Sequence, residues 1–234
     1  MTNIDYDLLI GADETGVGDY FTPIVFVACY VPKENIEKVK ELGVKDSKKL
    51  SDIKIKAIYP ELLNLVKYKK SILTQKGYNK LIESKINNNE IKTLLHFQTI
   101  NSLQDKENLK GLNIIIDQYT QNEGILEKHI VKLSNLFAEK HGWSKPLSNI
   151  YLETKAEDKS IAVACASIIA RKILLDLIGK QNHEWSFEFP LGASTKVDEA
   201  AAKFINKYGL EKLKDVAKIS FKTTQKAKLL SMKN

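Results

Sequence analysis

The chain has 234 residues, of which 43% are hydrophobic and 28% are charged, the balance of an ordinary globular protein with a buried core. Its net charge of +7 favours a polyanionic partner such as nucleic acid. The sequence contains no apolar run of about 18 residues and no N-terminal basic and apolar leader. These absences argue against a membrane partner and predict a cytoplasmic protein.

The type of basic residue indicates how the chain would contact nucleic acid, and the two cysteines indicate its redox compartment. Arg171 is the only arginine, so nearly all of the positive charge is lysine, which meets phosphate as a point charge. We therefore expect contacts to a nucleic-acid backbone more than readout of bases. Cys29 and Cys165 lie in apolar stretches, which suits small core residues in a reducing compartment.

In the first half of the chain, apolar periodicity predicts alternating strands and helices. We expect one helix to start at Ser51 and Asp52 and to break or restart at Pro60, because proline lacks the backbone N–H that a helix uses. The expected strands are residues 7–12, 21–31 and 67–73, and the other expected elements are helices at 35–42, 74–85 and 90–103 and a turn at 87–89.

In the second half, residues 112–117 form the clearest central strand, because a run of isoleucines suits burial on both faces of a sheet. With the following helix and strand this segment predicts a right-handed parallel crossover. The pattern predicts one α/β domain over residues 1–234, with 190–234 as its helical C-terminal extension. The remaining expected elements are a helix at 123–140, a strand at 149–153, one long helix from 156 to about 179, and helices from 190 onward with breaks near 209 and 220.

Two adjacent carboxylates, Asp13 and Glu14, follow the first apolar strand. Burying a carboxylate is costly unless it is paired or binds a metal ion, and no Lys or Arg lies between Tyr6 and Val25. Gly16 and Gly18 then allow the backbone to turn tightly and to approach a ligand. The simpler alternative is a turn whose two acids face water.

Asp117 ends the central strand and Glu157 begins the long helix, so both can join Asp13 and Glu14 at the C-terminal edge of the sheet. Four carboxylates without cysteine or histidine suit Mg²⁺ or Mn²⁺, and two such ions can act on one phosphate. A capping box from Thr154 to Glu157 and a turn at Asp117 are the alternatives.

The histidines and tryptophans show no metal-ligand spacing. We expect the histidines on the surface or at helix caps, and the tryptophans in the core or at an interface. These residues are His96, His129, His141, His183, Trp143 and Trp185.

Five motifs together resemble the type 2 ribonucleases H, and they are most similar to ribonuclease HIII. The match runs in order from about residue 7 to residue 228. The motifs are residues 13–21 (DETGVGDYF), 46–50 (DSKKL), 116–119 (IDQY), 154–171 (TKAE through IAVACASIIAR) and 192–201 (GAS and VDEAA).

The resemblance implies a ribonuclease H-like fold, with a five-stranded mixed sheet between helices and a helical C-terminal part. It implies hydrolysis of the RNA strand of RNA/DNA hybrids, giving 3′-hydroxyl and 5′-phosphate ends. No obligatory protein partner is evident from the sequence. Asp13, Glu14, Asp117 and Glu157 take the family's catalytic and metal-binding positions, with two Mg²⁺ or Mn²⁺ ions. The implied substrate-binding residues are Thr15, Gly16, Val17 and Gly18, whose backbone would sense 2′-hydroxyls, together with Ser47, Lys48, Lys49 and Ser194.

Three features favour HIII over HII. Glu157 replaces the usual aspartate, Val17 stands where HII has arginine, and residues 192–197 lack the tyrosine with which HII reads a single ribonucleotide junction. The sequence departs from HIII in having Val17 for threonine and Thr22 for glycine, and in starting close to Asp13, where HIII proteins usually carry an N-terminal substrate-binding domain. The alternatives are HII activity on single ribonucleotides, a non-catalytic hybrid-binding module, and a junction resolvase of the same fold.

Overall fold

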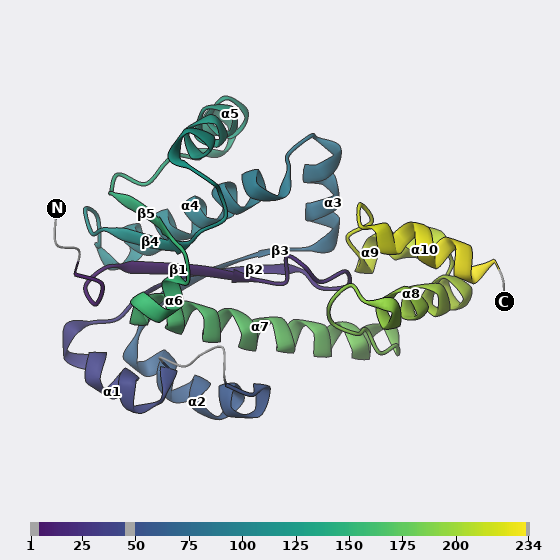
Figure 1. Ribbon diagram of the computed structural model, residues 1–234, viewed down its shortest axis with the longest axis horizontal. Helices are drawn as coiled ribbons and strands as arrows, with labels where there is room; N and C mark the ends of the chain where they lie inside the picture. Colours follow the sequence, from purple (N-terminus) through teal and green to yellow (C-terminus); the bar gives the residue numbers. More distant parts are fainter. Residues whose placement is uncertain (1–4, 45–49, 233–234) are drawn as a thin grey trace. The chain divides into compact units, whose positions relative to one another are not determined.

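The computed structural model, which describes residues 5–44 and 50–232, contains a five-stranded mixed sheet (Figure 1). Its order is β3-β2-β1-β4-β5, and β1 pairs with β4, and β4 with β5, in parallel. This confirms the predicted sheet. The strands are β1 Ile10–Thr15, β2 Ile24–Tyr30, β3 Lys67–Leu73, β4 Ile114–Asp117 and β5 Ile150–Glu153.

The helices follow the predicted order, with two differences in the first half. Pro60 lies inside an unbroken α2, so the predicted break is wrong. Pro60 and Lys56 are both exposed, so the Lys56 carbonyl that loses its helical donor can bind water instead. The helix expected at 90–103 is present as α4, but it already begins at Asn88, where we expected a turn. The helices of this half are α1 Ile36–Glu41, α2 Asp52–Leu65, α3 Gln75–Glu83 and α4 Asn88–Glu107, with a 3-10 turn at Lys33–Asn35.

In the second half, the long helix that we expected from 156 to about 179 is two helices. Ser160 adopts an extended conformation (φ −125°, ψ 123°) and separates α6 from α7, which continues to Trp185. The C-terminal helices with breaks near Gly209 and Ser220 are confirmed. The elements are α5 Glu123–His141, α6 Ala156–Lys159, α7 Ile161–Trp185, α8 Thr195–Tyr208, a 3-10 turn at Leu210–Lys212, α9 Leu213–Val216 and α10 Lys222–Ser231.

The chain divides into two compact units. Unit 1 comprises Met1–Thr15, Phe26–Ser71 and Asn89–Lys172, and unit 2 comprises Gly16–Val25, Ile72–Asn88 and Ile173–Asn234. The assignment of residues 1–234 to one catalytic domain stays a prediction.

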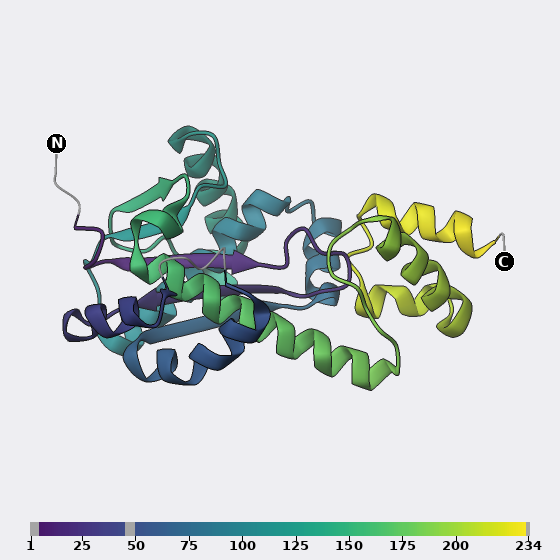
Figure 2. The same ribbon diagram turned by 60° about the horizontal axis from the view of Figure 1, so that its bottom comes forward.

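Within unit 1, α4 covers one face of the sheet and the first turns of α7 cover the other (Figures 1 and 2). The approach of α7 to β1 is so close at Gly11 that a Cβ there would lie 2.3 Å from the backbone nitrogen of Val163. Trp143 is buried and stacks on Phe97, with ring centroids 5.9 Å apart, so its predicted place in the core is confirmed. Cys29 and Cys165 are also buried, and both are free thiols.

Unit 2 has its own aromatic core. Tyr20 and Phe21 from the segment after β1 pack with Phe189 and with Phe204 of α8, and Trp185 packs against the same cluster. Among the described residues, no helix is long and apolar enough to cross a membrane.

Candidate active site

The C-terminal ends of two neighbouring strands bring acidic residues together in unit 1. Asp13 and Glu14 lie near the end of β1, and Asp117 is the last residue of β4. Ala12 pairs with Ile116 in the parallel register, so Asp13 and Asp117 each follow directly after a paired residue. The apolar residues before them are buried and fix this register.

The surroundings of the Asp13 carboxylate disfavour its ionised form. Burial, the charge of Glu14 and the charge of Asp117 raise the pKa of Asp13 to about 7, against the lowering effect of hydrogen bonds from Ser167 and from the Glu14 backbone. The Glu14 N–H donates to Oδ1 of Asp13 at 2.8 Å. Ser167 on α7 is a partner that the sequence analysis did not single out. A carboxylate in this setting gains stability from a bound cation.

Glu14, in contrast, is held by two basic side chains of α4. Lys92 Nζ lies 2.6 Å from Oε1 of Glu14, and His96 Nε2 lies 2.8 Å from Oε2. Burial alone would raise the pKa of Glu14, but His96 and Lys92 together lower it to about 2. No Lys or Arg lies close to Glu14 in the sequence, but Lys92 and His96 of α4 bind its carboxylate in the folded chain. The spacing of Lys92 and His96, four residues apart on one helical face, is the signal that could have indicated them.

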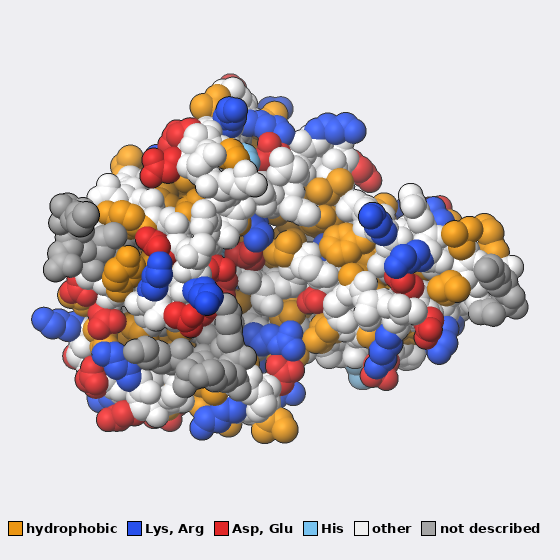
Figure 3. All heavy atoms as spheres, viewed as in Figure 1, with side chains coloured by type: hydrophobic (Ala, Val, Ile, Leu, Met, Phe, Trp, Pro, Cys, Tyr) orange, Lys and Arg blue, Asp and Glu red, His pale blue; other side chains and the backbone are white. Residues whose placement is uncertain are grey.

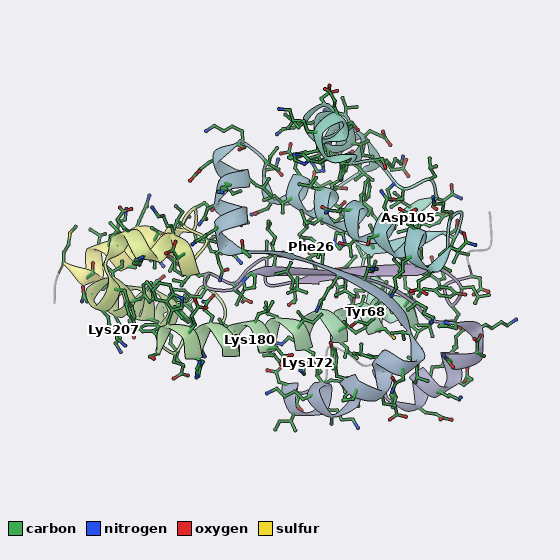
Figure 4. The ribbon with its side chains drawn as sticks, turned by 180° about the vertical axis from the view of Figure 1, so that it is seen from behind. Phe26, Tyr68, Asp105, Lys172, Lys180 and Lys207 are labelled. Carbon is green, nitrogen blue, oxygen red and sulfur yellow. The ribbon has the colours of Figure 1, made fainter. Side chains whose placement is uncertain are left out.

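His96 and His129 correct the prediction that the histidines lie on the surface or at caps. His96 is fully buried; its ring stacks on Tyr119 and meets Phe26 of β2 edge-on, with centroids 5.1 Å apart (Phe26 is labelled in Figure 4). His129 is also buried, and its Nδ1 lies 3.1 Å from Oγ1 of Thr93. The neighbours of both rings come from other elements, which one-dimensional spacing does not reveal.

The start of α6 lies against the end of β4. Oδ1 of Asp117 accepts a hydrogen bond from the Ala156 N–H at 3.2 Å, and Glu157, the next residue, is 5% exposed. The capping box proposed for Glu157 is not formed in the described chain, because the N-cap of α6 is Lys155 (φ 54°) and no side chain caps it. Asp117 likewise binds a distant backbone N–H, which a simple turn residue would not do.

The donor chemistry of these residues fits a divalent cation, although no ligand set is already assembled. All four acids offer oxygen atoms, which Mg²⁺ and Mn²⁺ prefer, and the hydrogen bonds of Asp13 offset only part of the effects that raise its pKa. Over residues 5–44 and 50–232, however, no group of three or more His, Cys, Asp or Glu is arranged so that it could hold a metal ion. A bound cation would therefore have to draw the carboxylates closer.

A pocket of about 270 Å³ opens beside Glu14 in unit 1. Ser167 lines it, and so does Arg171, whose guanidinium binds both carboxylate oxygens of Asp52 at 3.0 and 3.1 Å. A larger pocket of about 780 Å³ in the same unit is lined by Lys69, Trp143 and ten other residues, none of them one of the four acids. The smaller pocket is therefore the one that belongs to the candidate site.

The predicted substrate-binding residues fall in different parts of the structure. Thr15 ends β1 in unit 1, whereas Gly16, Val17 and Gly18 belong to unit 2; Gly16 is buried, Val17 is half-buried and Gly18 is exposed. Ser194 is the exposed N-cap of α8, also in unit 2. Ser47, Lys48 and Lys49 lie outside the described residues. On the face shown in Figure 3, basic side chains are interspersed with acidic ones.

Comparison with known proteins identifies the family. Residues 10–224 match the sequence model of the family described as Ribonuclease HII. Ribonuclease HIII of Bacillus mycoides (strain KBAB4) is 39% identical over 220 residues, which are 94% of this chain and 67% of that protein. Ribonuclease HIII of Bacillus cereus (strain AH187) is 38% identical over 94% of this chain and 68% of that protein.

Solved structures agree with this result. Bst-RNase HIII in complex with Mn²⁺ has a TM-score of 0.87 at 34% identity, over 97% of this chain and 71% of that chain. Aquifex aeolicus RNase H3 has a TM-score of 0.70 at 28% identity, over 93% and 73%. The predicted ribonuclease H-like fold is thus confirmed. The chain belongs to the ribonuclease HII family, and it is a ribonuclease H.

Proposed function

We propose that this ribonuclease H hydrolyses the RNA strand of RNA/DNA hybrids in the manner of ribonuclease HIII, with two divalent cations and with 5′-phosphate and 3′-hydroxyl products. The reaction adds water across a P–O3′ bond: the water oxygen joins phosphorus, and O3′ leaves as a hydroxyl. The observation that carries the proposal is the half-buried Asp13 carboxylate, which lies beside Asp117 at the end of two parallel strands with a pKa raised to about 7.

In this proposal Asp13, Glu14, Asp117 and Glu157 hold the cations. Divalent cations bound there would supply positive charge for the attacking water and for the scissile phosphate. Ser167 orients Asp13 through its hydrogen bond, and the Ala156 N–H orients Asp117. Lys92 and His96 fix both oxygens of Glu14.

Recognition of RNA would come from the backbone of residues 15–18. Glycine at 16 and 18 lets the main chain come close to the minor groove, where 2′-hydroxyls separate RNA from DNA. Lys48, Lys49, Ser47 and Ser194 would contact the phosphate backbone. The two buried free thiols fit a reducing compartment, so we place the activity in the cytoplasm.

In this proposal, the absence of a junction-reading tyrosine favours HIII activity over HII activity. A lone ribonucleotide offers one 2′-hydroxyl, so an enzyme needs a dedicated side chain to find the junction. Residues 192–197 contain no tyrosine, and Tyr20 is fully buried with its hydroxyl 2.8 Å from Oγ1 of Thr224. Backbone contacts alone need several consecutive 2′-hydroxyls to discriminate.

One cleavage experiment tests these points together. We expect efficient cleavage in Mg²⁺ of a duplex with a run of about four or more ribonucleotides, as the HIII resemblance implies, and poor cleavage of a duplex with one ribonucleotide. Comparable rates on the two substrates would favour HII activity. No cleavage in either Mg²⁺ or Mn²⁺, with hybrid binding retained, would favour a non-catalytic binding module.

Asp13→Asn provides the matched variant for this experiment. The amide keeps the shape of the side chain but loses the charge that holds a cation, so we expect cleavage to be abolished while hybrid affinity stays within a few fold. Near wild-type cleavage by the folded variant would contradict the site assignment.

A further inference from the structure

Lys218 is the one fully buried lysine among the described residues, and it lies in unit 2 between α9 and α10. A buried ammonium is costly unless its charge and its donors are satisfied. Methionine has almost the same length and would fill the same space without this cost. The hydrogen bonds of Lys218 therefore indicate what the lysine contributes.

All three hydrogen bonds that Lys218 donates go to carbonyl groups of one short segment, residues 16–22, in the same unit, whereas its own carbonyl accepts from the Phe221 N–H at 3.1 Å. Nζ donates to the carbonyl oxygens of Gly16 at 2.6 Å and Thr22 at 2.9 Å. The backbone N–H of Lys218 donates to the carbonyl of Tyr20 at 2.9 Å. The rings of Phe221 and Tyr78 lie 5.7 and 5.8 Å from Nζ and complete its surroundings. Lys218 thus fixes the path of this segment at three points.

The Gly16 carbonyl is held most firmly. Besides Lys218 Nζ, it accepts a hydrogen bond from the Asp19 N–H at 3.3 Å and from Oγ1 of Thr22 at 3.4 Å. Gly16 has a φ of +90°, and a Cβ there would lie 2.3 Å from the carbonyl oxygen of Pro23, so only glycine fits this conformation.

The position of this oxygen determines where the next N–H points. In a trans peptide the C=O and the N–H point in opposite directions, and the chain has no cis peptide bond in its described part. Because the Gly16 oxygen faces the buried ammonium, the N–H of Val17 faces away from it. Val17 is half-buried and Gly18 is exposed, so the segment leaves the interior at this point.

We propose that Lys218 is a positioning residue for RNA recognition: it holds the Gly16–Val17 peptide so that the Val17 N–H can donate to a ribose 2′-hydroxyl oxygen. Lys218 itself does not touch the substrate. The inference rests on the proposed function, in which residues 15–18 sense 2′-hydroxyls, and it adds the group that orients them.

Affinity for two duplexes of one sequence, an RNA/DNA hybrid and a DNA duplex, tests the proposal in a metal-free buffer at one salt concentration. We expect Lys218→Met to weaken hybrid binding about tenfold, while DNA duplex binding stays within twofold of wild type. Lys226→Met is the control, since Lys226 is a lysine of α10 that pairs with Asp198 at 2.9 Å. It also replaces a lysine of unit 2 by methionine, and it should leave the ratio of the two affinities unchanged.

A second variant keeps the test decisive if Lys218→Met does not fold. Replacing Val17 by its α-hydroxy acid converts the Gly16–Val17 amide to an ester, which removes the N–H and also makes the Gly16 carbonyl a weaker hydrogen-bond acceptor. We expect the same loss of hybrid preference. A wild-type affinity ratio in this ester variant, or in folded Lys218→Met, would overturn the inference and leave the proposed function intact. If the wild-type protein itself shows no preference for the hybrid and no cleavage of it, the proposed function fails, and this inference fails with it.

Discussion

The ammonium nitrogen of Lys92 lies 2.6 Å from Oε1 of Glu14, although the two residues are far apart in the sequence. His96, one turn further along α4, binds the other oxygen of the same carboxylate. Both side chains of the Lys92–Glu14 pair are mostly buried, 19% and 10% exposed, so water screens their attraction weakly. Lys92 therefore places a positive charge beside Glu14, a residue that we propose as a metal ligand.

Lys92 should compete with a divalent cation for Glu14. We expect Lys92→Met to lower the Mn²⁺ concentration at half-saturation about fivefold, since a charge-assisted contact of about 1 kcal/mol no longer has to be displaced. Isothermal titration with Mn²⁺ measures this directly. Lys132→Met is the control. Lys132 of α5 lies 2.7 Å from Glu90, which is a residue of α4 but not one of the four acids. Unchanged or weaker Mn²⁺ binding by Lys92→Met would contradict the prediction.

Glu157→Gln separates a metal ligand from a structural residue. Glutamine keeps the size and hydrogen-bonding groups of the buried side chain but cannot neutralise a cation. We expect hybrid cleavage to fall at least about 100-fold while the melting temperature stays near that of wild type. Asp158→Asn, at the exposed next position of α6, should leave the cleavage rate unchanged. Wild-type cleavage by Glu157→Gln would remove Glu157 from the site.

Gly11→Ala tests the contact between β1 and α7. The added Cβ would lie 2.3 Å from Val163 N and 2.5 Å from the carbonyl carbon of Ala162, and backbone atoms cannot give way as a flexible side chain can. We expect the free energy of unfolding in urea to fall by about 2 kcal/mol or more. Gly179→Ala is the control: it adds a Cβ at an exposed position of α7 with nothing within 4 Å, and should raise helix stability by up to about 1 kcal/mol. Equal stabilities of the two variants would show that the close approach is absent.

The stability of the protein should depend on pH through Lys218. Burial lowers the pKa of Lys218 from its ordinary value of 10.5 to about 7, against the opposing charge of Asp19. Between these two values the unfolded chain binds a proton that the folded chain does not, so stability rises with pH. From pH 7 to pH 9 we expect a gain of about 2 kcal/mol that Lys218→Met lacks.

Urea unfolding of both proteins at the two pH values measures this difference, because titration of all other groups is shared and cancels. An identical pH response in wild type and variant would show that Lys218 titrates as an ordinary lysine.

Local rules were enough to predict most elements. Ser51 and Thr74 were predicted helix starts, and each side chain caps its helix by accepting a backbone hydrogen bond, from Lys54 and Gly77 respectively. The parallel register then placed Asp13 beside Asp117, because the carboxyl ends of adjacent parallel strands meet at one edge.

What the sequence did not reveal depends on which positions the folded chain exposes and which distant residues it brings together. Pro60 stays within α2 because its face is exposed, and Ser160 interrupts the expected long helix although no proline or glycine marks the break. Lys92 and His96 reach Glu14 only because α4 lies across β1. Lys218 follows the same pattern: its partners, residues 16–22, are almost the length of the chain away.

The buried thiols of Cys29 and Cys165 make it possible to measure how often the core around them opens. Burial raises the pKa of the Cys29 thiol, with its neighbour Cys165 as a further cause, so the folded chain presents little thiolate to an alkylating reagent. Alkylation must wait until the core around β2 and α7 separates, and its rate therefore measures how often this core opens. The same chemistry requires a reductant in every refolding experiment, because an unfolded chain exposes both sulfurs and can join them by air oxidation.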